Sequence, residues 1–218
     1  MLQRYITAQA AFEHLFFHIK YSGELFANKT TKAIFNVSFE ILYPLERNIE
    51  TSWRRWKESY AELEYQWYLS GDRNPEVVEH EAKIWTSIKD DSGYVNSNYG
   101  WWWLRNDQLK RMIEILKTDP ESRRAILVHY NPDNIQDYTK DTPCNVVLNF
   151  YIHKKELHMT IFARSIDLVF GFCNDQYCFS RLQEDVAMQL GITAGSSHYF
   201  ITNLHIYEKH WELNQRSK

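Results

Sequence analysis

The spacing of apolar residues changes along this chain, and the change restricts the folds that it can adopt. Between Trp53 and Trp67, large apolar residues recur every three or four positions, which is the period of one helix face. Further along, apolar residues come in short runs, and Lys154-Lys155 separates the last two as the turn of a hairpin does. These runs cover residues 125–130, 145–152 and 157–161. Helices followed by adjacent strands are typical of an α+β fold, so we predict a mainly antiparallel or mixed sheet packed with helices.

Further elements are predicted from local signals. A dense apolar segment predicts a buried helix over residues 2–19, and loose alternation predicts a strand over residues 32–42. Asp107 is a candidate N-terminal cap for a short helix. The final helix is expected over residues 176–190, with Gly191 in a favourable position to end it.

Composition narrows the class of protein. The chain has 218 residues with 25 basic and 28 acidic side chains, a net charge of −3, so binding to many nucleic-acid phosphates is not expected. Three cysteines are an odd number, which argues against a disulfide framework and for a reducing compartment. Neither a signal peptide nor an apolar run of about 20 residues is visible, so we expect a cytoplasmic protein without a membrane segment. The length suits one domain over residues 1–218.

Two residues are candidates for chemistry, each with a plainer alternative. Cys144 follows a proline at the start of a strand, where its sulfur could face a pocket and act as a nucleophile. The alternative for Cys144 is a small buried hydrophobe. Glu64 lies among aromatic residues of the first-half helix, where burial could raise the pKa of its carboxyl and suit it to acid–base chemistry. The alternative for Glu64 is an exposed helix residue.

Two arginine groups flank Cys144 in the sequence. Arg123-Arg124 precedes one strand and Arg164-Ser165 follows another. The planar fork of arginine suits phosphate, and a serine hydroxyl adds a donor. Taken singly, each pair could equally be a solvated surface group.

The segment from Asp167 to Asp175 leads from a strand into a helix around Gly171. Its carboxylates could cap that helix or accept hydrogen bonds from a ligand. His205 and His210 have no third partner at metal-binding spacing, and we expect no metal site. Glycine-rich motifs for dinucleotides and triphosphates are also absent from the sequence.

These residues occur in an order that resembles the thymidylate synthase superfamily over essentially the whole chain. The resemblance implies an α+β homodimer on a mixed sheet, a pyrimidine nucleoside monophosphate as substrate and 5,10-methylenetetrahydrofolate as co-substrate, with no need for nucleic acid. The matching positions are Glu64, Trp67, Trp85, residues 96–100, Arg123-Arg124, Pro143-Cys144, the segment from Arg164 to Asp167, Gly171, His205 and Tyr207.

The resemblance also implies a role for each matching residue. Cys144 would add to carbon 6 of the nucleotide, and Glu64 would organise the catalytic water. The other implied roles are phosphate binding by Arg164 and Ser165 with Arg123 and Arg124 from the partner subunit, sugar binding by His205 and Tyr207, folate binding by Trp85 and Asp167, and a place near the nucleophile for Tyr99.

One position separates branches of the superfamily. Synthases that act on deoxyuridylate have asparagine where this chain has Asp175, and in this the chain resembles the phage deoxycytidylate 5-hydroxymethylases. A carboxylate accepts hydrogen bonds from the amino group and the protonated ring nitrogen of cytosine, and it stabilises positive charge on the ring. Asn145 in place of histidine and Ile88 in place of a second tryptophan are further departures from ordinary synthases. We therefore predict that carbon 5 of dCMP receives a one-carbon unit with addition of water, giving 5-hydroxymethyl-dCMP and tetrahydrofolate.

Several alternatives stay open. His205 and Tyr207 would contact a hydroxyl that deoxyribose and ribose share, so CMP is a second candidate substrate. A methylating synthase acting on dUMP or dCMP and a non-catalytic nucleotide- or RNA-binding relative are the others. Lys29 or Lys32 is the candidate replacement for the phosphate-binding arginine near the N-terminus of the family. Because the sequence stops soon after Tyr207, we expect the folate site either to close differently from that of other family members or to hold folate loosely.

Overall fold

The computed structural model describes residues 3–132 and 140–215, and within them a mixed sheet of eight strands forms the centre of the fold. Its strands are β1 (Gln3–Tyr5), β2 (Glu24–Phe26), β3 (Thr31–Ile41), β4 (Ile126–Val128), β5 (Asn145–His153), β6 (Glu156–Ala163), β7 (Ile166–Asp167) and β8 (Thr193–Tyr207). The order is β1-β3-β8-β6-β5-β4, while β2 pairs with β3 and β7 pairs with β8. The β1–β3, β6–β8 and β7–β8 pairs are parallel and the others antiparallel. The predicted α+β class with a mixed sheet is confirmed.

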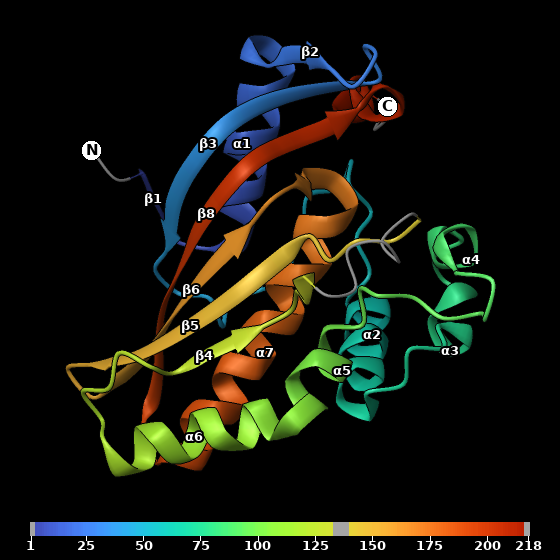
Figure 1. The fold of residues 1–218 in the computed structure, drawn as a ribbon. Coiled ribbons are helices and arrows are strands. Elements are labelled where there is room, and N and C mark those ends of the chain that lie inside the picture. Colours follow the sequence, from blue (N-terminus) through green and yellow to red (C-terminus); the bar gives the residue numbers. More distant parts are fainter. Residues whose placement is uncertain (1–2, 133–139, 216–218) are drawn as a thin grey trace.

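Helices cover one face of this sheet. The helices are α1 (Ala8–Ser22), α2 (Glu58–Ser70), α3 (Glu76–Glu79), α4 (Ile84–Ile88), α5 (Tyr99–Leu104), α6 (Gln108–Thr118) and α7 (Cys173–Leu190), with a π-helical turn at Leu168–Phe172 and short 3-10 turns at Arg105–Asp107, Glu208–His210 and Leu213–Gln215. In Figure 1, α1 and α7 lie behind the strands, which face the viewer. The core fills the space between, and large side chains such as Phe12, Phe150 and Phe179 are fully buried there.

Helix α7 places polar side chains inside the protein. Every residue from 173 to 180 is buried, so the first half of the helix passes through the interior rather than over the surface. Burying each large apolar side chain contributes about 1.5–3 kcal/mol, and Phe179 and Leu182 of this helix do so fully. The same insertion carries Asn174 and Asp175 away from water.

Turn residues fix two of the predicted boundaries. Lys154 and Lys155, between β5 and β6, both have left-handed backbone angles, with φ of 52° and 65°. Two successive left-handed residues form the tight turn that matches the twist of a hairpin, so the predicted hairpin is confirmed. Gly191 ends α7 with φ of 69°, also as predicted.

Other sequence expectations need correction. The first helix begins at Ala8 rather than residue 2, because residues 3–5 pair with β3 and Thr7 caps the helix through its hydroxyl. Trp53 belongs to the segment before α2, where it packs against Phe16. Asp107 precedes α6 as expected, but its side chain makes no capping hydrogen bond. Strand β8 is absent from the sequence prediction, although it joins the two halves of the sheet.

Candidate active site

Cys144 lies immediately before β5, and Arg164, which follows β6, holds it in place. The Arg164 guanidinium donates from Nε to the carbonyl of Pro143 at 3.0 Å and from Nη2 to the carbonyl of Thr142 at 2.7 Å. Its Nη2 is also 3.8 Å from the Cys144 sulfur, and its backbone N–H donates to the Cys144 carbonyl at 3.0 Å. The structure therefore brings the predicted nucleophile and the predicted phosphate ligand together.

The electrostatics around Cys144 favour the neutral thiol in a single chain. Burial raises the pKa of Cys144 to about 12, and the carboxylates of Asp175, Asp141 and Asp167 add to that effect. Arg164 acts in the opposite direction. Because the thiolate is the reactive form, further positive charge beside the sulfur would be needed to populate it at neutral pH.

Glu64 projects from α2 into the interior, where only 3 % of it is exposed. Its two oxygens accept hydrogen bonds from the Tyr68 hydroxyl at 2.8 Å and the Asn174 amide at 2.7 Å. Burial raises the pKa of the Glu64 carboxyl, while hydrogen bonds from Asn174, Tyr68 and Tyr60 oppose the rise. The alternative of an exposed helix glutamate is wrong, and the geometry suits a group that takes and returns protons.

Asp175 lies one residue beyond Asn174 on α7 and is also buried. The Asn145 amide donates to Asp175 Oδ2 at 2.8 Å. Burial and then the charge of Glu64 raise the pKa of Asp175 to about 8, against the lowering effect of the Asn145 hydrogen bond. A carboxyl group with this pKa is mostly protonated at neutral pH, so it can donate one hydrogen bond and accept another.

Tyr99 and Asn145 connect these groups to the nucleophile. The Tyr99 hydroxyl accepts hydrogen bonds from the Asn145 backbone at 3.2 Å and from the Asn145 amide at 2.9 Å. Asn145 thus touches both Tyr99 and Asp175, and it is fully buried. Its Oδ1 has no hydrogen-bond partner among the described residues. Tyr99 is therefore near Cys144, as the resemblance implies.

His129 is a buried site neighbour that sequence reasoning missed. The Trp103 indole donates to its Nε2 at 3.0 Å, and its Nδ1 is 3.0 Å from the carbonyl of Asn145. Burial lowers the pKa of His129 to about 4, so it supports Asn145 as a neutral ring. The only signal in the sequence was a histidine at the end of an apolar run.

The candidate sugar and phosphate ligands meet where β7 pairs with β8. That pairing sets Asp167 opposite His205. His205 contacts Asn203 at 2.8 Å, and burial together with Arg164 lowers its pKa to about 4. The ring of Tyr207 lies edge-on to His205 with centroids 5.2 Å apart, and Tyr207 is 41 % exposed. Ser165, in the turn between β6 and β7, is half-buried.

The predicted folate residues come from two different elements, Asp167 from the end of β7 and Trp85 from α4. Asp167 accepts the backbone N–H of Val169 at 2.9 Å, so it caps the π-helical turn, and burial raises its pKa to about 6. Trp85 of α4 packs edge-on against Trp67 at 5.1 Å and donates to the Tyr60 hydroxyl at 2.9 Å. Through Tyr60 it reaches the surroundings of Glu64. Ile88, the departure noted above, ends α4 and packs against the core.

Arg123 and Arg124 lie apart from the rest of the site in a single chain. Both are exposed, and Arg124 is 3.8 Å from Asp119. They precede β4, whose first residue Ile126 pairs with Asn149, five positions beyond Cys144, or about 17 Å along a strand. Among the residues that it describes, the structure therefore does not bring Arg123 and Arg124 together with Cys144.

The two candidate lysines differ in their surroundings. Lys32 donates to the Lys20 carbonyl at 2.8 Å and lies over the Trp211 ring, so it has a packing role. Lys29 is exposed in the turn between β2 and β3, with φ of 66°. Lys29 is therefore the freer of the two to meet a ligand.

Residues 3–132 and 140–215 contain neither a candidate metal site nor a candidate membrane-spanning helix. Within these ranges, no group of three or more histidine, cysteine, aspartate or glutamate residues is arranged to hold a metal ion. None of the helices described has the length and apolar character to cross a membrane.

Comparison with known proteins assigns the chain to a family. The model of the thymidylate synthase family matches residues 11–217, so the chain belongs to that family, as its motifs predict. It is 32 % identical over 195 residues to a deoxyuridylate hydroxymethyltransferase of Bacillus phage SP01, covering 82 % of this chain and 51 % of that protein. It is 30 % identical over 171 residues to the deoxycytidylate 5-hydroxymethyltransferase of Enterobacteria phage T4, covering 72 % and 70 % of the two chains. A thymidylate synthase of Buchnera aphidicola is 28 % identical over 162 residues, covering 70 % and 61 %. The chain thus spans about half the length of the first of these relatives.

Proposed function

We propose that this protein is a deoxycytidylate 5-hydroxymethyltransferase. It would join a one-carbon unit from 5,10-methylenetetrahydrofolate to carbon 5 of dCMP and add water, giving 5-hydroxymethyl-dCMP and tetrahydrofolate. The thymidylate synthase family uses this folate with pyrimidine nucleoside monophosphates. The observation that carries the proposal is the buried carboxyl of Asp175, which stands beside Asn145 where a synthase would have an amide.

Base pairing with Asp175 explains the preference for cytosine. A protonated Asp175 donates to the unprotonated ring nitrogen of cytosine and accepts from its amino group. Transfer of that proton to the ring gives a carboxylate facing two donors, so the pair survives either protonation state. Uracil has one donor and one acceptor on this edge, and its acceptor oxygen is repelled once Asp175 ionises.

Cys144 starts the proposed reaction by adding to carbon 6 as a thiolate. The ring electrons move to carbon 5, which bonds to the one-carbon unit and then loses its proton. Release of the folate amine leaves an exocyclic methylene on the nucleotide. Glu64 removes a proton from water as the water oxygen bonds to that methylene. The electrons return through the ring, the carbon 6–sulfur bond breaks, and Cys144 leaves as a thiolate.

The folate is proposed to bind beside Gly171. A side-chain carbon built at Gly171 would lie in van der Waals contact with Asp167 at 3.9 Å and with Asp175 at 4.0 Å, so Gly171 lies close to both carboxyl groups. The Asp167 carboxylate can accept the N–H groups of a pterin. When bound, the folate would supply the one-carbon unit, and Trp85 would border it from α4.

Phosphate binding is proposed to need a second subunit. Arg164 and Ser165 would hold the phosphate with Arg123 and Arg124 of the partner subunit, while His205 and Tyr207 bind the sugar. The helix-free face of the sheet supports a dimer, since the stacked rings of Phe162 and Phe200 are about two-fifths exposed there. These two rings line a hollow of about 320 Å³ beside Arg164, which a second sheet could fill. We also propose a cytoplasmic location, which the three free cysteines support.

The test of this function also includes dUMP as a second candidate substrate. Because one relative is named a deoxyuridylate hydroxymethyltransferase and a protonated Asp175 can pair with uracil, dUMP is the alternative substrate of this chain. We therefore propose incubating dCMP, CMP and dUMP separately with 5,10-methylenetetrahydrofolate and measuring product masses. Hydroxymethyl-dCMP as the main product is expected. Hydroxymethyl-CMP would correct the sugar and hydroxymethyl-dUMP the base, whereas a methyl product would mean a synthase, and no product would favour a binding protein.

A further inference from the structure

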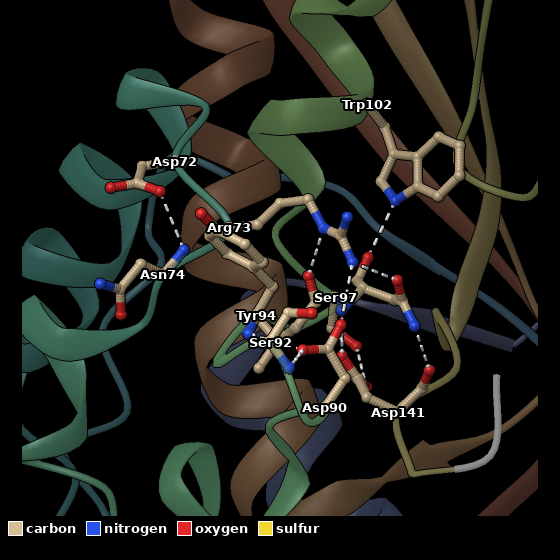
Figure 2. Close-up of polar contacts among 11 residues, drawn as sticks. Asp72, Arg73, Asn74, Asp90, Ser92, Tyr94, Ser97, Trp102 and Asp141 are labelled. Carbon is tan, nitrogen blue, oxygen red and sulfur yellow. Dashed lines mark hydrogen bonds and ion pairs between the residues drawn. The ribbon is translucent and has the colours of Figure 1, made fainter. Parts of the chain in front are cut away.

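Residues 95–99, which we name the bridge segment, connect the candidate nucleophile to the helix of the candidate acid–base residue. The bridge segment follows α4 and ends at Tyr99, the first residue of α5. Figure 2 shows the polar contacts around it, with Asp141 and Arg73 approaching from different parts of the chain. The mechanism above uses neither Asp141 nor Arg73.

Asp141 attaches the bridge segment to the segment that carries Cys144, just before β5. Its Oδ2 accepts the backbone N–H groups of Asn96 and Ser97, each at 2.7 Å, and its Oδ1 accepts the Ser97 hydroxyl. The Asn96 amide donates to the Asp141 carbonyl at 2.9 Å. Only 8 % of Asp141 is exposed, so these hydrogen bonds are shielded from water.

Tyr99 makes a second attachment on the other side of Cys144. Its hydroxyl accepts both hydrogen bonds from Asn145 described above. Asp141 is three residues before the cysteine and Asn145 is one residue after it. The bridge segment is therefore hydrogen-bonded to the chain on both sides of the nucleophile, before and after it in sequence.

The opposite side of the bridge segment is fixed to the end of α2. Arg73 donates to the Val95 carbonyl at 2.9 Å and to the Asn96 side chain at 2.7 Å, and its carbonyl accepts the Val95 N–H at 3.0 Å. The Asn98 amide donates to the Trp67 carbonyl at 3.2 Å. Trp67 lies three residues beyond Glu64 on α2, so the bridge segment links Glu64 to Cys144 through the backbone.

We propose that Asp141 is a positioning residue that fixes Cys144 relative to Glu64 by anchoring the segment before β5, which carries Cys144, to the bridge segment. The proposal rests on the function assigned above only in taking Cys144 as the attacking group. Removing the carboxylate would leave two half-buried backbone N–H groups without this acceptor and free the Cys144 segment to shift. A displacement of about 1 Å at a reacting group can lower a rate about 100-fold.

The test compares Asp141→Ala, Asp141→Asn and Asp91→Asn in the full chain. The Asp141→Asn variant keeps an oxygen that accepts from the two backbone N–H groups, and its NH2 group can donate to the Ser97 hydroxyl. Asp91 is fully exposed in the same loop region and pairs with Lys140, so Asp91→Asn is the matched surface control. The rate measured is exchange of the carbon 5 hydrogen of dCMP or dUMP for solvent deuterium without folate. Addition of the thiolate at carbon 6, deuteration at carbon 5 and reversal of both steps account for that exchange.

Asp141→Ala is expected to slow exchange about 10- to 100-fold with the nucleotide KM changed less than about threefold. Asp141→Asn should recover a rate within about fivefold of wild type, and Asp91→Asn should equal it. Alkylation of Cys144 followed against pH gives a second readout. The profile should move to lower pH in Asp141→Asn, because one of the negative groups beside the thiol is gone while Arg164, Asp175 and Asp167 stay.

Wild-type exchange in a folded Asp141→Ala variant would overturn the proposal, and so would an Asp141→Asn rate as low as that of alanine. If the alanine variant does not fold, Ser97→Ala replaces it: a two- to fivefold loss is expected, and no loss overturns the inference. Exchange by wild type without any hydroxymethyl product would refute the proposed function alone. Absence of exchange in wild type would refute both.

Discussion

The interior and the rim of the candidate site are built differently. In the interior, Glu64 and Asp175 are buried, and each is held by a neutral amide, from Asn174 and Asn145 respectively. At the rim, Arg164 and Tyr207 are exposed. Arg164 donates its hydrogen bonds to backbone carbonyls of the segment that carries Cys144. Buried side chains that are held by hydrogen bonds are already in position for a reaction. Exposed side chains take up a defined position only when they bind a ligand or another subunit. In the proposed function, one chain holds the base-reading and proton-transfer groups, while phosphate binding depends on a second subunit.

The largest expected effect comes from Cys144, which lies between the two regions. Cys144→Ala should lower turnover by at least about 10³-fold because no other group can form the carbon 6 bond. Nucleotide binding should persist, since the interior and rim contacts remain. Turnover and nucleotide titration on the same preparation would measure both. Cys178→Ala, at a second free cysteine that is buried in α7, should keep most of the activity. Equal loss in both variants would argue against Cys144 as nucleophile.

Asp175→Asn should alter the interior without touching the rim. An amide does not ionise, so it always offers one donor and one acceptor to the matching groups of uracil. The ratio of kcat/KM for dUMP to that for dCMP should therefore rise by at least about 10²-fold. Competition between the two nucleotides, followed by mass spectrometry, measures the ratio. Asp185→Asn, on the same helix but bonded to Tyr65, is the control and should leave the ratio unchanged. An unchanged ratio in Asp175→Asn would refute the assignment of Asp175 to base reading.

Mixed dimers would test the rim. Arg123→Ala and Cys144→Ala are each expected to be inactive alone. In a heterodimer of the two, one site pairs an intact cysteine with an intact arginine from the other subunit. Random mixing makes half the dimers heterodimers, so about a quarter of wild-type activity should return. No recovery in verified heterodimers would show that the arginine does not act across subunits.

The sequence predicted the parts of this fold and site that depend on local chemistry. The hairpin at Lys154-Lys155 and the end of α7 at Gly191 follow from turn geometry that residue type dictates. The burial of Glu64 was one of two alternatives, and the structure decides it because α7 brings Asn174 against α2. The ordered motifs of the sequence indicated the thymidylate synthase family, which the family match over residues 11–217 confirms.

Long-range contacts account for what the sequence did not predict. Strand β8 was missed because its polar and small residues lack clear alternation, and pairing with both β3 and β6 overrides that weak signal. Asp141 and His129 gave no local sign of their roles. Their partners, Ser97 and Trp103, lie 44 and 26 residues away in sequence.

The smallest expected effect is a change in how stability depends on pH, and it would sharpen the view of the interior. The pKa of Asp175 is raised from 3.8 to about 8 in the folded protein. Between these values the folded state keeps a proton that the unfolded chain has released, so stability falls as pH rises from about 4 to about 8. Glu64, whose pKa is also raised by burial, adds to the slope in the same direction. Thermal unfolding measured at several pH values in this range should therefore show a falling Tm, by about 2–4 °C for each kcal/mol lost. Asp175→Asn should flatten the slope and leave the part due to Glu64, whereas Asp91→Asn, at an exposed position, should keep the wild-type slope. Equal slopes in wild type and Asp175→Asn would mean that Asp175 is ionised in the folded protein, and discrimination against uracil would then rest on charge repulsion at every pH.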